Sequence, residues 1–230
     1  MIADNLHAVT ARIAQTCASA GRAAGSVRLL AVSKTFGPDA VQQAFDAGQR
    51  AFGENYIQEA VEKIAALAAL PIEWHCIGPI QSNKTRLVAE HFQWVHTVDR
   101  LKIAQRLSDQ RPLHLPPLQV CIQVNVDGGP TKSGVVPQDA VALARAVAAL
   151  PRLQVRGIMC IPEPAPDFAT AREVFLVAQR VFEAGLAEGL PLDTLSMGMS
   201  GDLDAAISGG STMVRVGSAI FGARHYPVAA

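Results

Sequence analysis

The chain has 230 residues, of which 50% are hydrophobic, and its 20 basic side chains balance 20 acidic ones. No run of Lys and Arg longer than a pair offers the positive charge that binding to a nucleic acid backbone requires. No apolar run approaches the ~20 residues needed to span a bilayer, and residues 1–15 lack the apolar core of a signal peptide. We therefore expect a cytoplasmic protein that binds neither nucleic acid nor membranes.

Short apolar runs alternate along the chain with longer segments of helical periodicity. An amphipathic helix is expected first, over residues 2–20. Helical segments then separate the apolar runs; in one of them Pro137 can occupy the first turn and apolar residues recur to Leu150. The eight apolar runs, interpreted as strands, are residues 27–34, 50–54, 72–78, 94–98, 118–126, 153–161, 194–200 and 213–221.

Eight strands separated by helices favour parallel pairing with right-handed crossovers, and eight such units close into a (β/α)8 (TIM) barrel. The barrel is compact, because this fold typically takes ~250 residues. The extra N-terminal helix could cover the position where a helix after the last strand is missing. The alternative is a doubly wound open sheet, which usually has fewer strands. No linker or repeat divides the sequence, so residues 1–230 are expected to form a single domain.

The four cysteines are widely scattered, without a C-x-x-C pair or a histidine spacing that would suggest a metal finger. Three lie inside apolar runs, where a thiol behaves as a small hydrophobic group. His75 and His96 also lie in predicted strands, and no cluster of His, Asp or Glu has a metal-ligand spacing. We therefore expect reduced cysteines and no metal site.

Function in a (β/α)8 barrel is built at the carboxyl ends of the strands. Lys34 ends the first strongly apolar run, where partial desolvation of its ammonium would favour the neutral amine that can attack a carbonyl. The alternative is a lysine that merely extends to solvent. Asn55 follows the second strand and either caps the next helix or points its amide into the pocket.

Two turns rich in small residues follow the last two strands. Residues 196–202 and 215–218 expose backbone amides and hydroxyls in the loops where such barrels most often hold a phosphate. Together with Lys34 they would suit a ligand that has both an aldehyde and a phosphate, and pyridoxal 5′-phosphate (PLP) is the obvious candidate. The alternative is that the glycines serve only turns and packing.

With these motifs in order, the sequence resembles the pyridoxal phosphate homeostasis protein family over nearly its whole length. The resemblance is carried by residues 30–35, 52–56, 74–84, 132–134, 195–200 and 214–222. It implies a single barrel like the N-terminal domain of alanine racemase, with PLP in Schiff-base linkage to Lys34.

The resemblance also implies a cofactor site around that lysine. Ser200, Gly217 and Ser218 would help to hold the phosphate, and Arg215 would face the pyridine nitrogen. The expected cofactor-binding residues are Lys34, Asn55, Met199, Ser200, Arg215, Gly217 and Ser218.

An arginine beside the pyridine nitrogen leaves that nitrogen unprotonated, which makes the ring a weaker electron sink than one paired with a carboxylate. Racemase relatives use a second base from a separate β-domain of a dimer, and the sequence ends at Ala230 without such a domain. The resemblance therefore implies a carrier or buffer of PLP, with apo PLP enzymes as recipients, that affects vitamin B6 and amino-acid balance. Because the pocket would be open, without a second domain, we expect a monomer. A slow PLP-dependent racemase or related enzyme is the alternative.

Two further positions bear on cofactor release. Lys132 matches a family lysine implicated in cofactor transfer or a second site, although a solvent-exposed loop lysine is an equal reading. Phe36 stands where many members of the family carry a second lysine, two residues after the Schiff-base lysine. A transfer scheme that needs this second amine at that position is therefore not expected for this protein.

Overall fold

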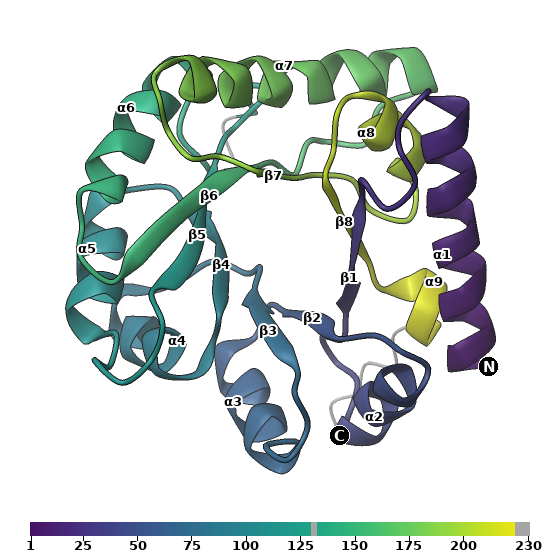
Figure 1. Cartoon of the computed structure of the whole chain (residues 1–230), viewed down its shortest axis with the longest axis horizontal. Coiled ribbons are helices and arrows are strands. Elements are labelled where there is room, and N and C mark those ends of the chain that lie inside the picture. Colours follow the sequence, from purple (N-terminus) through teal and green to yellow (C-terminus); the bar gives the residue numbers. More distant parts are fainter. Residues whose placement is uncertain (130–132, 224–230) are drawn as a thin grey trace.

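The computed structural model describes residues 1–129 and 133–223. Its strands form one closed, parallel barrel in chain order, with β8 pairing back to β1 (Figure 1). The (β/α)8 prediction is confirmed, and the open sheet is excluded. The strands are β1 (Arg28–Val32), β2 (Ala51–Glu54), β3 (Glu73–Cys76), β4 (Trp94–Val98), β5 (Leu118–Gln123), β6 (Leu153–Met159), β7 (Thr194–Ser196) and β8 (Met213–Val216).

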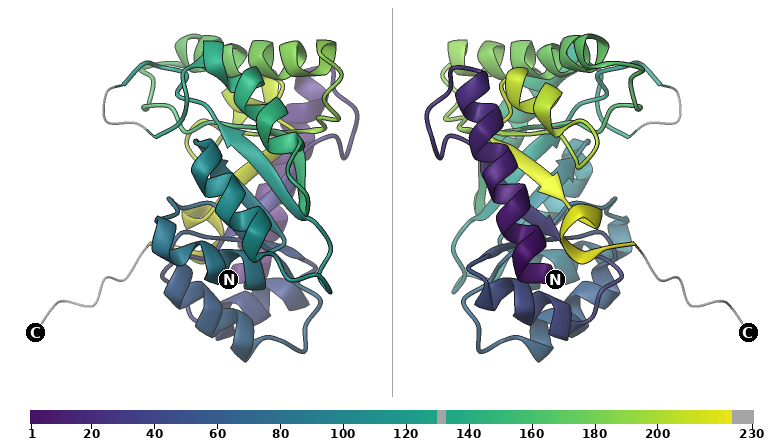
Figure 2. Two further views of the ribbon diagram at one scale, coloured as in Figure 1. Left: turned by 90° about the vertical axis from the view of Figure 1, so that its left-hand side faces the viewer. Right: turned by 90° about the vertical axis from the view of Figure 1, so that its right-hand side faces the viewer.

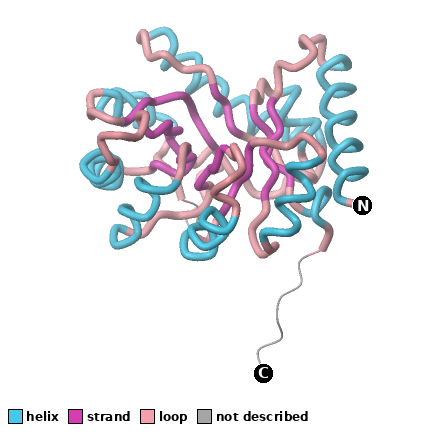
Figure 3. The backbone as a smooth tube through the Cα atoms, turned by 60° about the horizontal axis from the view of Figure 1, so that its bottom comes forward, coloured by secondary structure: helices cyan, strands magenta, loops and turns pink. Residues whose placement is uncertain are grey.

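Helices surround this barrel on the outside (Figure 3). Their buried residues recur at helical spacing; in α7, for example, Phe175, Ala178, Val181 and Gly185 face the strands. The helices are α1 (Ile2–Ser19), α2 (Pro38–Asp46), α3 (Ile57–Ala66), a 3-10 turn η1 (Ser82–Lys84), α4 (Thr85–His91), α5 (Leu101–Gln110), α6 (Pro137–Ala148), α7 (Phe168–Ala187), α8 (Leu203–Ser208) and α9 (Ser218–Phe221).

The N-terminal helix α1 lies along the outside of the barrel beside α8 and α9 (Figure 2). The side chain of Asn5 donates to the carbonyl oxygen of Ile220 at 2.9 Å. Further along the helix, Arg12 forms an ion pair with Asp204 at 2.8 Å. The predicted covering role of this helix is confirmed. The predicted strand at 213–221 was too long, because β8 ends at Val216 and a short helix, α9, follows.

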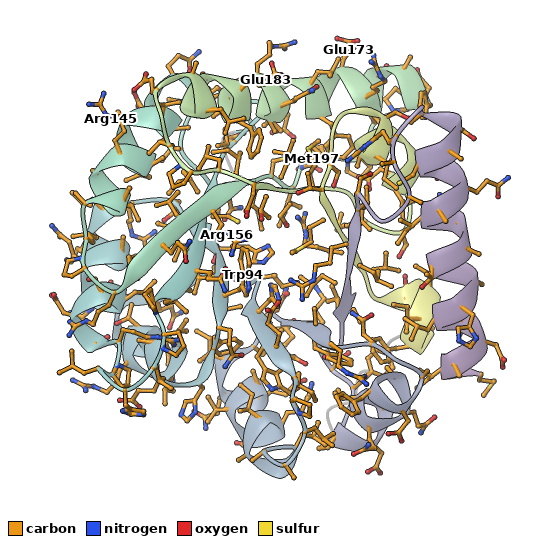
Figure 4. All side chains as sticks on the ribbon, viewed as in Figure 1. Trp94, Arg145, Arg156, Glu173, Glu183 and Met197 are labelled. Atoms are coloured by element: carbon orange, nitrogen blue, oxygen red, sulfur yellow. The ribbon has the colours of Figure 1, made fainter. Side chains whose placement is uncertain are left out.

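The barrel interior is filled by side chains from alternate strand positions. One apolar cluster contains Leu30, Val32, Ala51, Ile77 and Met213, and a second contains Trp94, Cys121 and Met159. Figure 4 shows Trp94 and Arg156 together within the ring of strands, and the Arg156 guanidinium lies 4.9 Å from the centre of the Trp94 ring. The interior is therefore a packed core and not an open channel.

Within the described part of the chain, no helix is long and apolar enough to cross a membrane. All four cysteines are buried and unpaired, as expected. Burial raises the pKa of the Cys76, Cys121 and Cys160 thiols to about 12, so these groups are unreactive at neutral pH.

Gly157 allows β6 and β7 to approach each other closely. Its partner in the ladder is Thr194, and a Cβ atom added at Gly157 would overlap the carbonyl oxygen of that residue. We expect Gly157→Ala to lower the free energy of unfolding by about 1–3 kcal/mol, the usual cost of overpacking. Urea denaturation measures the loss, with Gly201→Ala as the matched control because its Cβ position is open. Equal stability of the two variants would contradict the close approach.

Candidate functional site

A cavity of about 480 Å³ lies at the end of the barrel where the strands have their carboxyl termini. This volume is within the range of roughly 300–1,000 Å³ typical of small-molecule sites. Its walls come from segments that follow β1, β2, β3, β6, β7 and β8, which is the functional face of this fold. All seven residues predicted from the sequence line this one cavity: Lys34, Asn55, Met199, Ser200, Arg215, Gly217 and Ser218.

Lys34 is half-buried at the cavity wall, two residues after the end of β1. The next residue, Thr35, has φ +69°, a left-handed conformation that β-branched residues rarely adopt. Its amide donates to Oε1 of Glu59 at 2.8 Å. A non-glycine residue keeps such a conformation only where its surroundings hold it. The turn that carries the lysine is therefore a firmly held part of the barrel.

A buried ion-pair network lies beneath this turn. The Lys63 ammonium, from α3, donates to Oε1 of Glu54 at 2.6 Å, to the carbonyl oxygen of Ser33 at 2.9 Å and to Oε1 of Glu59 at 3.1 Å. Burial raises the pKa of the Glu54 carboxyl, although the Lys63 charge and hydrogen bond act in the opposite direction. Because Glu59 also accepts from the residue after Lys34, the network holds the backbone on both sides of that lysine.

Sequence reasoning missed this network. The available signal was the position of Lys63, which falls on the buried face of α3 with Ile57 and Ala60. A lysine on an apolar helix face needs a buried partner, because an unpaired charge is costly to desolvate. Glu59 lies one helical turn earlier, and Glu54 ends the preceding strand.

The turn after β7 requires glycine at its first position. Gly198 has φ +94°, and a Cβ atom there would overlap the side chain of Ala206. The turn is closed by the Met199 amide, which donates to Oδ1 of Asp202 at 2.6 Å. This geometry brings the residues that follow the turn to the cavity.

Two hydroxyls from separate turns face the same cavity. Ser200 follows β7 and Ser218 follows β8. Among the residues that the structure describes, neither hydroxyl has a hydrogen-bond partner. Next to Ser218 in the wall is Gly217, where an added Cβ would lie 3.1 Å from the carbonyl oxygen of Val32, a tight contact between β8 and β1. The site therefore offers two uncommitted hydroxyl donors beside a tightly packed stretch of backbone.

Arg215 supplies a buried positive charge at the base of the cavity. It is 3% exposed, and its guanidinium donates from Nη1 to the Ser196 hydroxyl and from Nη2 to the Cys160 carbonyl oxygen, both at 2.8 Å. Burial lowers the pKa of Arg215. No carboxylate in the described part of the chain forms an ion pair with it. An arginine remains charged here and can only donate hydrogen bonds.

The two interpretations of Asn55 are separated by the structure. The residue at the N-cap of α3 is Tyr56, and no side chain caps that helix, so the capping interpretation is wrong. Asn55 is half-buried and lines the cavity instead. The backbone of Asn55 lies so close to Gly78 that a Cβ atom added at Gly78 would overlap it. The close approach of these two loops fixes Asn55 at the cavity wall.

Phe36 also lines the cavity, and its ring packs against that of Phe221 with centroids 5.2 Å apart. The wall is therefore apolar at the position where many relatives were expected to carry a second lysine. Lys132 lies outside the described residues. Over those that are described, no group of three or more His, Cys, Asp or Glu side chains could hold a metal ion.

The barrel carries an amine, a guanidinium and two hydroxyls at its carboxyl end, and residues 5–225 match the family described as "Alanine racemase, N-terminal domain". Within that fold, the chain belongs to the pyridoxal phosphate homeostasis protein family. It is 60% identical over 225 residues to the Pseudomonas aeruginosa protein of that name, covering 98% of this chain and 96% of the relative. The family identified from the sequence motifs is confirmed.

Solved structures agree with this assignment. An unknown protein from Bifidobacterium adolescentis superposes with a TM-score of 0.89 and 36% identity, covering 95% of this chain and 94% of that chain. The protein PipY of Synechococcus elongatus, whose structure has PLP bound, gives a TM-score of 0.79 and 38% identity over 91% of this chain and all of its own.

Proposed function

We propose that this protein binds PLP reversibly in the cavity and acts as a carrier or buffer in PLP homeostasis. The observation that carries the proposal is the meeting of Lys34, Arg215, Ser200 and Ser218 in one cavity of suitable volume. The names of the curated relatives and the PLP-bound structure of PipY support it.

The cavity fits the three reactive parts of the cofactor. When bound, PLP supplies an aldehyde carbon, a phosphate dianion and a pyridine nitrogen. Lys34 would provide the amine that attacks the aldehyde, as a Schiff-base lysine. The hydroxyls of Ser200 and Ser218, which lack partners among the described residues, would donate to the phosphate, and Arg215 would donate to the pyridine nitrogen. Asn55 and Met199 would complete the wall.

Trapping the covalent adduct tests the proposal. Purified protein is mixed with PLP, and its absorbance spectrum is compared before and after addition. Borohydride reduction and peptide mass spectrometry then locate the adduct. We expect a new absorption band and a reduced adduct on the peptide that contains Lys34. If no band and no adduct form, the cavity binds some other phosphate ligand.

We propose a carrier rather than an enzyme because of Arg215. A guanidinium does not give a proton to the pyridine nitrogen, and an unprotonated ring stabilises a carbanion poorly. We therefore expect no exchange of solvent deuterium into the Cα position of amino acids beyond that caused by free PLP. Incorporation above that background would favour the alternative, a slow racemase or related enzyme.

The phosphate contacts lead to a quantitative expectation. Ser200→Ala or Ser218→Ala is expected to weaken PLP binding by about tenfold, the effect of losing one hydrogen bond to a charged group. Equilibrium dialysis measures the change. Ser26→Ala, remote from the cavity, is the control. An unchanged affinity in both cavity variants would place the phosphate elsewhere.

The proposal extends to the setting of the protein. The family resemblance suggests apo PLP enzymes as the recipients, and the exposed Ser218 and Met199 place part of the cavity wall at the surface. We propose that residues 1–230 act as one domain and a monomer, which light scattering tests. A cytoplasmic location is supported by the four unpaired cysteines.

A further inference from the structure

A continuous run of hydrogen bonds crosses the barrel interior from the cavity to the opposite end. It begins at Arg215 on β8, whose Nη1 is 2.8 Å from the hydroxyl of Ser196 on β7. That hydroxyl lies 2.8 Å from Nδ1 of His96 on β4, and Nε2 of His96 lies 2.9 Å from Nδ1 of His75 on β3. Nε2 of His75 lies 2.7 Å from Oε1 of Glu73. We call these five residues the interior chain.

The two ends of the interior chain determine the direction of every bond in it. Arg215 can only donate, and a carboxylate such as Glu73 can only accept. His75 therefore carries its proton on Nε2, and its Nδ1 accepts from Nε2 of His96. The remaining nitrogen of His96 accepts from the single hydroxyl proton of Ser196, whose oxygen accepts from Arg215. The opposite tautomers would set two lone pairs against each other at the Glu73 end.

Burial keeps both imidazoles neutral. His75 and His96 are 0% exposed, and desolvation lowers the pKa of His75 and lowers that of His96 well below its ordinary value. Desolvation alone would raise the pKa of Glu73, but the hydrogen bond from His75 and the charge of Arg28, 2.8 Å away, hold it at about 2. The interior chain therefore runs from one positive charge to one negative charge through neutral groups.

Because arginine does not release its proton, the interior chain cannot conduct protons to the cavity. Its effect is to orient a charged group. Arg215 has no carboxylate partner in the described part of the chain, so Ser196 and the histidines behind it connect the buried guanidinium to Glu73.

We propose that Ser196, His96 and His75 are positioning residues, which hold the Arg215 guanidinium in the orientation that it presents to the cofactor. This inference rests on the proposed PLP site. The Arg215 guanidinium donates to two acceptors within the barrel, the Ser196 hydroxyl and the Cys160 carbonyl oxygen. Loss of the Ser196 hydroxyl removes one of them. The pyridine nitrogen of a bound cofactor would then be free to take a proton from water, and the absorption of the cofactor would change while Lys34 still held it.

The first experiment uses the cofactor-free protein. Two-bond 1H–15N correlation spectra of 15N-histidine-labelled protein report which ring nitrogen carries the proton. At neutral pH we expect His75 and His96 both to be neutral and protonated on Nε2. A proton on Nδ1 of either ring would overturn the single direction of the interior chain, whether or not PLP binds.

The second experiment uses the PLP-loaded protein. Ser196→Ala and His96→Leu are expected to change the ratio of the cofactor's absorption bands by about tenfold, as one lost hydrogen bond to a charged group would do. The amount of borohydride-trapped adduct should stay within about twofold of wild type, since Lys34 lies outside the interior chain. Ser196→Thr restores the hydroxyl and should restore the band ratio.

A matched control separates positioning from stability. Met159→Ala removes a fully buried interior side chain outside the interior chain and should lower thermal stability without changing the band ratio. Should Ser196→Ala fail to fold, His96→Asn is the second variant, because its amide oxygen keeps the acceptor for Ser196 and should preserve the wild-type spectrum. Wild-type spectra in Ser196→Ala and His96→Leu with full adduct would overturn the positioning role. Absence of any adduct on the wild-type protein would instead overturn the proposed function.

Discussion

Replacing Lys34 by alanine is expected to abolish the covalent attachment of PLP. Lys34 lines the cavity at the end of β1, and the amine it supplies is the nucleophile required for the linkage. PLP would then be held by non-covalent contacts with Ser200, Ser218 and Arg215. The affinity for PLP should therefore fall further than in the Ser200→Ala or Ser218→Ala variant, for which we expect a loss of about tenfold. Absorbance titration and borohydride trapping measure both effects.

Two control variants define the cause of that loss. Lys34→Arg keeps a positive charge at the site but cannot form the linkage, so it should lose the adduct as completely as the alanine variant. Lys102→Ala removes an exposed lysine of α5 and should leave the adduct unchanged. A full adduct on the Lys34→Ala protein would show that another lysine is the attachment site.

Most of the fold could be predicted from the sequence because each unit of the barrel carries its own periodicity. The run at 94–98 is buried over its whole length and is a strand with the same bounds. Strand ends were predicted less well, since buried apolar residues also follow the end of a strand. At 213–221, Ile220 and Phe221 are buried in a short helix, and their apolar composition alone does not distinguish such a helix from a strand.

The cavity residues could be predicted because the carboxyl ends of parallel strands share one rim, so motifs distant in the sequence must meet there. The interactions that support these cavity residues could not be predicted in this way. The pairing of Glu54 with Lys63 depends on how α3 packs on β2, and the contact of His75 with His96 depends on the barrel register that places β3 beside β4. The pattern of α3 indicates only that Lys63 needs a buried partner, and no local pattern indicates that the two histidines meet.

The two supporting arrangements differ in kind. The network of Lys63 and Glu54 joins β2 and α3 to the backbone around Lys34, whereas the interior chain spans four strands and ends on Arg215. Each therefore acts on a different side of the cavity. Loss of the first should lower stability and move the amine, while loss of the second should change the charge beside the cofactor with the amine in place.

Replacing Lys63 by methionine is expected to be the most destabilising single change in the supporting structure. Lys63 and Glu54 are 3% and 1% exposed, and the substitution leaves the carboxyl group buried without a counter-charge. Breaking a buried pair in this way typically costs about 3–5 kcal/mol in the free energy of unfolding. Urea denaturation at pH 8 measures the loss, with Lys102→Met on the surface as the matched control.

The pH dependence of the Lys63→Met variant identifies the cause. Burial already raises the pKa of Glu54, and without the opposing charge of Lys63 the folded state keeps a proton that the unfolded state releases above its ordinary pKa. The folded state then binds more protons, so the stability of the variant should fall as pH rises above about 4.5, by up to about 1.4 kcal/mol per pH unit. Glu54→Gln combined with Lys63→Met removes the titrating group and should abolish this slope. A slope that persists in the double variant would show that another carboxyl group is responsible.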